Sequence, residues 1–312
     1  MGAVTAMRPQ GPGQGQGVLA DPRLLAAGAA GFAAATAALW AFRGLPLGTA
    51  FFWAVPFPLF AAGLGFGPGA ALGAAALATL LVAMLGGSLA ALAMLALFAV
   101  PVPLLLLAGV RGGHFALSLP LALLGLWPVA VLLATALFLP GEQGLEALMR
   151  SAVETALARM GAQAPDLLVA ELVRVKAAAI GFWTGVMLLA NAAAAQGFLE
   201  KRGLALAAKP DWAAVRLPGW YPLLPAVAAG LFLAAPEGAD AIPLSSLLLL
   251  LVPLFLQGVA GVHARLRGHA GRVPLLALFY LLLVLFLQLL GPALVGLGLY
   301  DQFRRRPAPR QI

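Results

Sequence analysis

Long apolar runs that carry no charge are the feature that most constrains what this chain can fold into. Between Leu24 and Leu139, only Arg43, Arg111 and His114 carry or can carry a charge. A helix that crosses a bilayer needs about 20 apolar residues, so this stretch has room for about five spans. The whole chain is 62% hydrophobic and 10% charged, whereas soluble domains have about 25% charged residues. Much of its surface therefore needs lipid as the solvent.

The sequence predicts an all-α fold, a polytopic transmembrane helix bundle that forms one domain over residues 21–303. Backbone polar groups in lipid must be satisfied within the segment, which favours helices. The Leu/Ala runs also lack the alternation of transmembrane strands. We expect eight or nine membrane segments, at about 24–42, 45–66, 68–86, 88–109, 117–139, 177–198, 220–235, 243–262 and 273–299.

The basic residues predict an orientation. Lys and Arg total 19 against 11 acids, a net charge of +8, and most of them fall in loops that one topology places on the same side. Positive loops stay inside, so we expect a bacterial cytoplasmic (inner) membrane with the N-terminus in the cytoplasm, and no nucleic acid partner. The polar residues 1–20 are expected to be disordered. Nine full spans would put the basic tail 304–312 outside. Either the last segment breaks near Gly291-Pro292 and returns, or an early segment is re-entrant.

Residues 141–176 form a predicted outer segment with structure of its own. Apolar residues including Val153 and Leu157 recur at helical spacing, and Glu146, Arg150 and Glu154 line another face. This pattern indicates an amphipathic helix on the outer membrane surface. A second helix is expected to start at Asp166 and to run toward the following span. The segment is either a plain surface cover or a lid over a ligand.

The residues that usually carry catalysis are missing from the predicted spans. The chain has no cysteine, which excludes thiolate nucleophiles and Cys-based metal sites. Acids lie in loops or at span ends, which argues against a carboxylate-coupled pump. The glycine-rich stretch 63–69 lacks the GK[ST] ending of a nucleotide loop. We therefore expect no enzyme activity, no metal and no cofactor.

Amides are the polar side chains that enter the spans. Asn191 and Gln257 can hydrogen-bond a neutral ligand, and with Trp183 and Trp53 they are the candidate ligand-binding residues. The alternative is helix packing, since an interhelical bond of this kind contributes only about 0.6 kcal/mol.

Two further patterns are candidate partner-binding sites. Small residues every fourth position on the first span let another helix approach closely, and the loop after the sixth span pairs charge with tryptophan. The candidate residues are Ala26, Ala30, Ala34, Ala38, Asp211 and Trp212.

Four stretches of the chain resemble the YybS-like family of bacterial membrane proteins, a domain of unknown function (number 2232). They are Trp53–Leu59 with the glycine-rich turn after it, the Asn191 span with its exit to Arg202, the loop 210–220, and 256–263 together with 298–304. The family is distantly similar to the substrate-binding subunits of energy-coupling-factor transporters. The resemblance implies that the alanine stripe meets a coupling subunit. The chain is longer than a six-span subunit of that kind.

Two functional hypotheses follow. The first is a membrane subunit that binds a small molecule for uptake and is powered by a separate coupling partner. The alternative is a non-transporting scaffold that recruits cytoplasmic or envelope proteins through the loop 199–220 and the tails. In both, the lipid bilayer is the main surrounding partner.

Overall fold

The computed structural model describes residues 21–111, 114–138, 144–162, 164–236 and 239–304, and these are helical apart from loops and one two-residue strand pair. The elements are α1 (Pro22–Phe42), α2 (Gly48–Ala54), α3 (Pro56–Phe66), α4 (Pro68–Met94), the π-helical turn η2 (Leu95–Ala99), α5 (Pro101–Gly109), β1 (Val110–Arg111), β2 (His114–Phe115), α6 (Ser118–Phe138), α7 (Leu145–Arg159), α8 (Asp166–Glu200), the 3₁₀ turn η3 (Trp212–Ala214), α9 (Leu223–Ala234), α10 (Ala241–Arg265), α11 (Arg272–Leu285) and α12 (Leu287–Phe303).

Six helical stretches in the described part are long and apolar enough to cross a membrane, which confirms a membrane-type helical fold. A seventh results if the bent pair α11–α12 counts as one span. The six stretches are Pro22–Phe42, Gly48–Phe66, Pro68–Gly109, Ser118–Phe138, Asp166–Glu200 and Ala241–Arg265.

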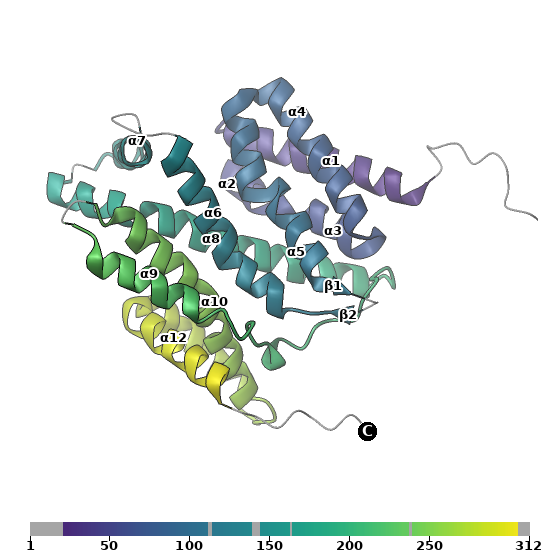
Figure 1. Ribbon diagram of the computed structural model, residues 1–312. Coiled ribbons are helices and arrows are strands. Elements are labelled where there is room, and N and C mark those ends of the chain that lie inside the picture. The colour runs from purple at the N-terminus through teal and green to yellow at the C-terminus, as the bar shows by residue number, and fades with distance from the viewer. Residues whose placement is uncertain (1–20, 112–113, 139–143, 163, 237–238, 305–312) are drawn as a thin grey trace, which may run out of the picture.

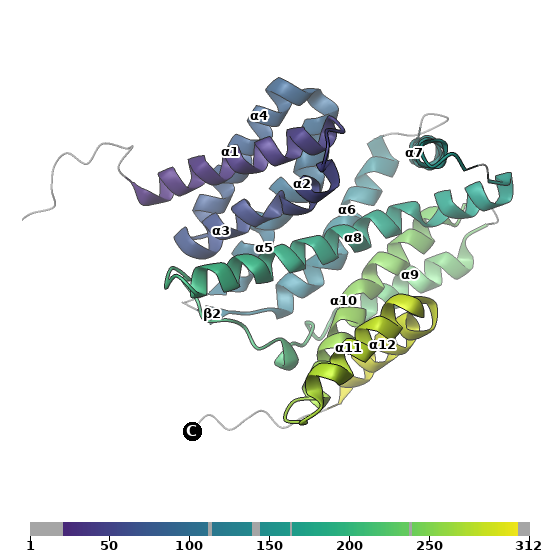
Figure 2. The same cartoon turned by 180° about the vertical axis from the view of Figure 1, so that it is seen from behind.

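The bundle has two groups of helices with α5, α6 and α8 between them (Figure 1 and Figure 2). Helices α1 to α4 form one group and α9 to α12 the other. Asp211 and Arg267 pair near the C-terminal ends of α8 and α10, and we call this end of the bundle the basic end. Arg174 and Asp240 pair near the N-terminal ends of the same helices, at the opposite end.

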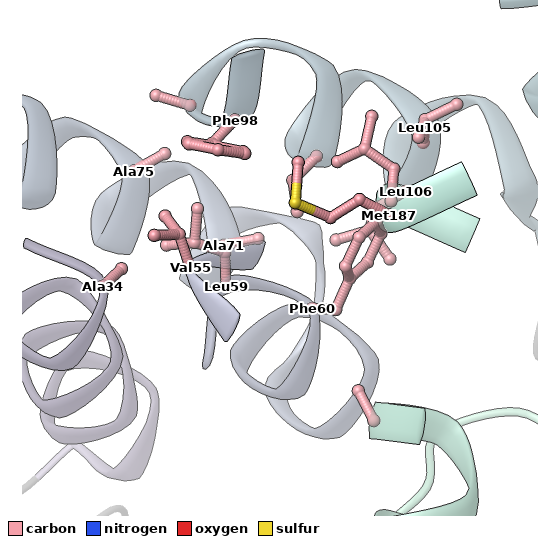
Figure 3. Packing of buried hydrophobic residues seen from close by; sticks show 14 of the residues in the cluster. Ala34, Val55, Leu59, Phe60, Ala71, Ala75, Phe98, Leu105, Leu106 and Met187 are labelled. Atoms are coloured by element: carbon pink, nitrogen blue, oxygen red, sulfur yellow. The ribbon is translucent and has the colours of Figure 1, made fainter. Parts of the chain in front are cut away.

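Small side chains bring α1 and α4 close together. Ala34 and Ala38 of α1 and Ala74 of α4 are fully buried, and Figure 3 shows Ala34 facing the α4 side of this core. A Cβ added to Gly31 would lie only 2.7 Å from the carbonyl oxygen of Ala74. In lipid the hydrophobic effect does not drive helices together, so they associate through van der Waals contacts that such close backbone approach allows.

Glycine and proline interrupt the long helical runs. Gly87 has a left-handed φ of 84°, a conformation that glycine adopts without steric cost. It falls between the predicted segments 68–86 and 88–109 and divides the 42-residue run Pro68–Gly109 into two arms. Pro101 follows η2 and has no N–H, and Trp127 of α6 donates to the free carbonyl of Ala96 at 2.7 Å.

The predicted segment 273–299 is broken in the structure, as in the alternative in which the last segment breaks and returns. Helices α11 and α12 meet at Phe286 at an angle of 118°, so the chain turns back. The bend lies at Phe286, ahead of the Gly291-Pro292 step at which the sequence analysis placed a break. Asp301 near the end of α12 binds Arg265 with two bonds of 2.8 Å, which returns α12 to the basic end.

The predicted segment 220–235 is only partly helical. Helix α9 has 12 residues, about 18 Å at 1.5 Å per residue, and is too short for a bilayer core of about 30 Å. The residues before α9 enter the bundle in a non-helical conformation. The hydroxyl of Tyr221 donates to the carbonyl of Leu250, near the middle of α10, at 2.9 Å.

The region 141–176 contains α7 and the start of α8. Val153 of α7 packs with Val169 and Val173 of α8 in a small separate cluster. Helix α8 has 35 residues and starts at Asp166, as the sequence predicts, and it runs without a break to Glu200. At about 52 Å it is longer than a bilayer core is thick.

Candidate functional site

A pocket with an apolar lining lies near the basic end, between α3, α5, α6 and α8. Its volume is about 70 Å³. Phe60 of α3 and Leu105 and Leu106 of α5 form one wall, and Figure 3 shows these three side chains beside Met187 of α8. The rest of the lining is supplied by Leu64, Phe115, Leu117, Pro120, Leu121, Leu124, Leu188, Leu189, Ala192, Ala193, Gln196, Lys209, Pro210 and Trp212.

The loop between α8 and α9 closes one side of the pocket with Lys209, Pro210 and Trp212. Backbone bonds hold this loop in place, including one from the N–H of Leu206 to the carbonyl of Leu64 at 3.0 Å. The amide of Gln196 donates to the carbonyl of Ala207 at 2.8 Å. The mouth of the pocket is therefore anchored to both α3 and α8.

Asp211 has a structural role in this loop. Its two carboxylate oxygens accept bonds of 2.6 and 3.2 Å from Arg267, and it also accepts from the backbone N–H of Ala213 at the start of η3. The hydrogen bond from Arg267 lowers the pKa of Asp211 below its usual range. The predicted partner residue Asp211 is thus bound within the chain, and its neighbour Trp212 lies half-buried at the pocket.

A second, more polar hollow adjoins the pocket at the basic end. Its volume is about 310 Å³, and Asp211, Arg216 and Ser118 are among its lining residues. Three of its lining residues, Phe115, Leu117 and Pro210, also line the apolar pocket. The two hollows are therefore neighbours that share these three residues as part of their walls.

Gln257 holds the non-helical chain between this loop and α9. Its Oε1 accepts from the N–H of Leu217 at 2.9 Å, and its Nε2 donates to the carbonyl of Gly298 at 2.9 Å and to Oε1 of Gln302 at 3.1 Å. Gln302 in turn donates to the carbonyl of Leu217 at 2.9 Å. Non-helical backbone at membrane depth is tolerated when protein groups satisfy it in this way.

Three of the four predicted ligand-binding residues, Asn191, Trp53 and Trp183, are neighbours in the structure. Asn191 is buried and donates to the carbonyl of Trp53 and to that of Met187, both at 2.8 Å. The rings of Trp53 and Trp183 meet at 6.2 Å, and both are exposed on the bundle surface. Gln257 lies apart from them, in the Leu217 network.

Asn191 fits the helix-packing interpretation. Trp53 lies at the end of α2, just before the break between α2 and α3 at Val55. Asn191 supplies a donor at this break from α8, so its amide group ties two parts of the bundle together.

The alanine stripe is also engaged inside the chain. Ala34 and Ala38 are covered by neighbouring helices, and Ala26 and Ala30 are half-buried. This surface of α1 is already largely occupied by packing such as that against α4.

The sequence analysis missed most pocket residues because leucine and alanine are common throughout the chain. Among the described residues, no group of three or more His, Asp or Glu side chains is placed to hold a metal ion. No protein-family model, curated protein or solved structure matches the chain. Fold and geometry together define a helical protein of the membrane-spanning type with an apolar pocket near its basic end.

Proposed function

We propose that this protein binds a small apolar or amphiphilic molecule in the pocket between α3, α5, α6 and α8, as a subunit of an uptake system that a separate coupling partner powers. The pocket is the observation that supports this proposal most directly. Spaces between the helices of a bundle, apolar with a few polar groups, are common ligand sites. Membership of the YybS-like family and its distant transporter similarity belong to the same proposal.

The proposal includes eight crossings and a returning C-terminal hairpin. Helices α1, α2–α3, the two arms on either side of Gly87, α6, α8, the segment 215–235 and α10 provide the crossings. Both described ends of the chain then lie at the basic end. Positive residues favour the cytoplasm. The basic end is therefore assigned to the cytoplasmic side of a bacterial cytoplasmic membrane, and α7 to the outer surface.

Cysteine labelling in whole cells tests this topology, because the chain has no native cysteine to remove. An impermeant maleimide is expected to label Ser151→Cys in α7 in intact cells, and to label Arg202→Cys and Phe303→Cys only after the membrane is opened. Labelling of Phe303→Cys in intact cells would contradict the returning hairpin.

The pocket lies near the basic end, which the proposed topology places in the cytoplasm. For an uptake subunit, this is the arrangement from which a ligand leaves toward the cell interior. Binding from outside then requires a second arrangement of the helices that line the pocket.

Filling the pocket tests the ligand-binding function. Ala193 of α8 lines the pocket, and its neighbour Ala194 is exposed without lining it. Native mass spectrometry of protein purified in mild detergent is expected to show a co-purified small molecule in the unaltered protein and in Ala194→Phe. Ala193→Phe should lose it. If both variants keep the same molecule, that molecule does not occupy this pocket.

The scaffold alternative is favoured by the firm anchoring of the loop after α8. Leu204 and Leu206 lie on this loop and are about half exposed. Their backbone N–H groups bond the carbonyls of Leu199 and Leu64, which fixes the loop. Leu204→Glu should then release a co-purifying protein and leave any pocket ligand bound. Trp212→Ala does not separate the two functions, because Trp212 lines the pocket.

A further inference from the structure

The pocket and the polar hollow beside it have complementary chemistry. The pocket is lined almost entirely by apolar side chains, whereas the hollow is lined in part by charged and hydroxyl groups. Because Phe115, Leu117 and Pro210 line both spaces, the two spaces are direct neighbours. A molecule that occupied both would need an apolar part and a polar part.

Two cations define the polar part. Lys209 lines the pocket at its mouth and Arg216 lines the hollow, and both side chains are exposed. Within the described part of the chain, neither has a carboxylate partner. Arg216 donates only to the backbone carbonyl of Arg304, at 3.3 Å.

Asp211, the acidic residue in the hollow, does not cancel the positive charge of Arg216 and Lys209. Asp211 is held by two bonds from Arg267, so its charge is compensated before any ligand arrives. The remaining charge around the hollow is positive, and it favours an anionic group there.

The size of the pocket limits the apolar part. A cavity of about 150 Å³ holds one benzene molecule in a well-studied engineered case, and this pocket has about 70 Å³. The pocket has room for a stretch of one hydrocarbon chain. It has no room for the two acyl chains of a phospholipid.

We propose that the natural ligand is a single-chain amphiphile with an anionic headgroup, a carboxylate or a phosphate, whose chain enters the apolar pocket, which Lys209 lines, and whose headgroup lies toward Arg216 in the neighbouring hollow. This inference rests on the proposed ligand-binding function. It adds the chemical class of the ligand and two specificity-determining residues.

Equilibrium binding of radiolabelled probes to the full-length protein in phosphatidylcholine nanodiscs tests the inference. The probes are dodecyl phosphate, dodecanoate and the neutral dodecanol, with empty nanodiscs subtracted. One or both anions should bind about fivefold more tightly than dodecanol, the factor expected from partly exposed charge contacts worth about 1 kcal/mol in total. The preferred anion identifies the headgroup.

Two sets of variants separate the headgroup from the pocket. Lys209→Gln combined with Arg216→Gln should weaken binding of the anions about fivefold and leave dodecanol unchanged. Ala193→Phe should abolish binding of all three probes, whereas Ala194→Phe should not.

Each contrary result has a distinct meaning. Equal binding of dodecanol and both anions, or anion binding that ignores the double substitution, overturns the headgroup assignment and leaves the pocket in place. Probe binding that Ala193→Phe leaves unchanged overturns the proposed function as well. Displacement of dodecyl phosphate by phosphatidylglycerol added to the nanodiscs makes a two-chain membrane lipid the occupant and overturns the single-chain assignment.

Discussion

Gln257→Leu is expected to destabilise the protein strongly, because this one side chain joins three parts of the bundle. Gln257 is 2% exposed and bonds the N–H of Leu217, the carbonyl of Gly298 and the side chain of Gln302. Leucine has a similar volume but can form none of these bonds. The substitution removes the bonds without opening a large cavity.

The size of the effect follows from those contacts. Interhelical hydrogen bonds in membranes contribute about 0.6 kcal/mol each, so three contribute about 2 kcal/mol. The buried N–H of Leu217 also loses its acceptor, and an unsatisfied buried donor costs about 1–3 kcal/mol. The free energy of unfolding should therefore fall by roughly 3–5 kcal/mol.

Unfolding by sodium dodecyl sulfate in mixed micelles, followed by circular dichroism, measures this change. Gln288→Leu is the matched control, because Gln288 lies exposed on α12 and the same substitution there should change stability by less than about 0.5 kcal/mol. Gln302→Leu should show part of the loss, and adding it to Gln257→Leu should cost less than the sum, since the two share a network. Equal unfolding midpoints for Gln257→Leu and Gln288→Leu would refute the reasoning.

Two further predictions use the same unfolding assay. Gly298→Ala should lower stability by more than about 2 kcal/mol, because its Cβ would lie 2.0 Å from the carbonyl oxygen of Leu254. Gly296→Ala, with open space around it, should be nearly neutral, and equal effects would contradict the tight contact. The lowered pKa of Asp211 means that its bond to Arg267 stabilises the fold above the usual aspartate pKa and is lost as pH falls through the lowered value. Asp211→Asn should remove this acid-dependent loss, and an unchanged pH profile would contradict it.

Local patterns were sufficient for the straight helices of the bundle. The predicted segments 24–42, 117–139 and 243–262 lie within about two residues of α1 and α6 and within three of α10. Long apolar runs define these helices, and the prolines inside α6 and α10, Pro128 and Pro253, do not end them. The helix start at Asp166 agrees with the prediction, whereas the fusion of this helix with the predicted segment 177–198 into α8 was not predicted.

The returning hairpin depends on contacts that local sequence does not encode. Leucine and phenylalanine continue without a break across Phe286, so no local signal marks the bend at this residue, and the expected break was placed near Gly291-Pro292 instead. In the structure α12 packs closely on α10, where a Cβ on Gly258 would lie 2.0 Å from the carbonyl oxygen of Leu294. This contact and the Gln302 network involve residues more than 35 positions apart in the chain. These contacts between residues far apart in the sequence stabilise the bend.

The functional residues of the candidate site were also hard to predict from local sequence. Polar residues were the visible signals in the spans, and both Asn191 and Gln257 bind backbone carbonyls of neighbouring segments. In lipid, where no water is present, a side-chain amide can hydrogen-bond backbone groups that proline or a non-helical turn leaves unsatisfied. A buried amide is therefore weak evidence for a ligand. A space lined by apolar residues and ending at cations without a carboxylate partner in the described chain, as at Lys209, is stronger evidence.

The segment 209–222 links the two features on which the proposals rest. At its start, Lys209 and Trp212 form the mouth of the pocket. Five residues beyond Trp212, Leu217 is held by Gln257 and Gln302, and further on Tyr221 reaches the middle of α10. A ligand that orders the mouth acts on the same short stretch of chain that α10 and α12 hold. Apart from the short turn η3, this stretch is not helical, so its backbone depends largely on those side chains for its position. Packing on α10 and α12 thus contributes to the position of the chain beside the pocket.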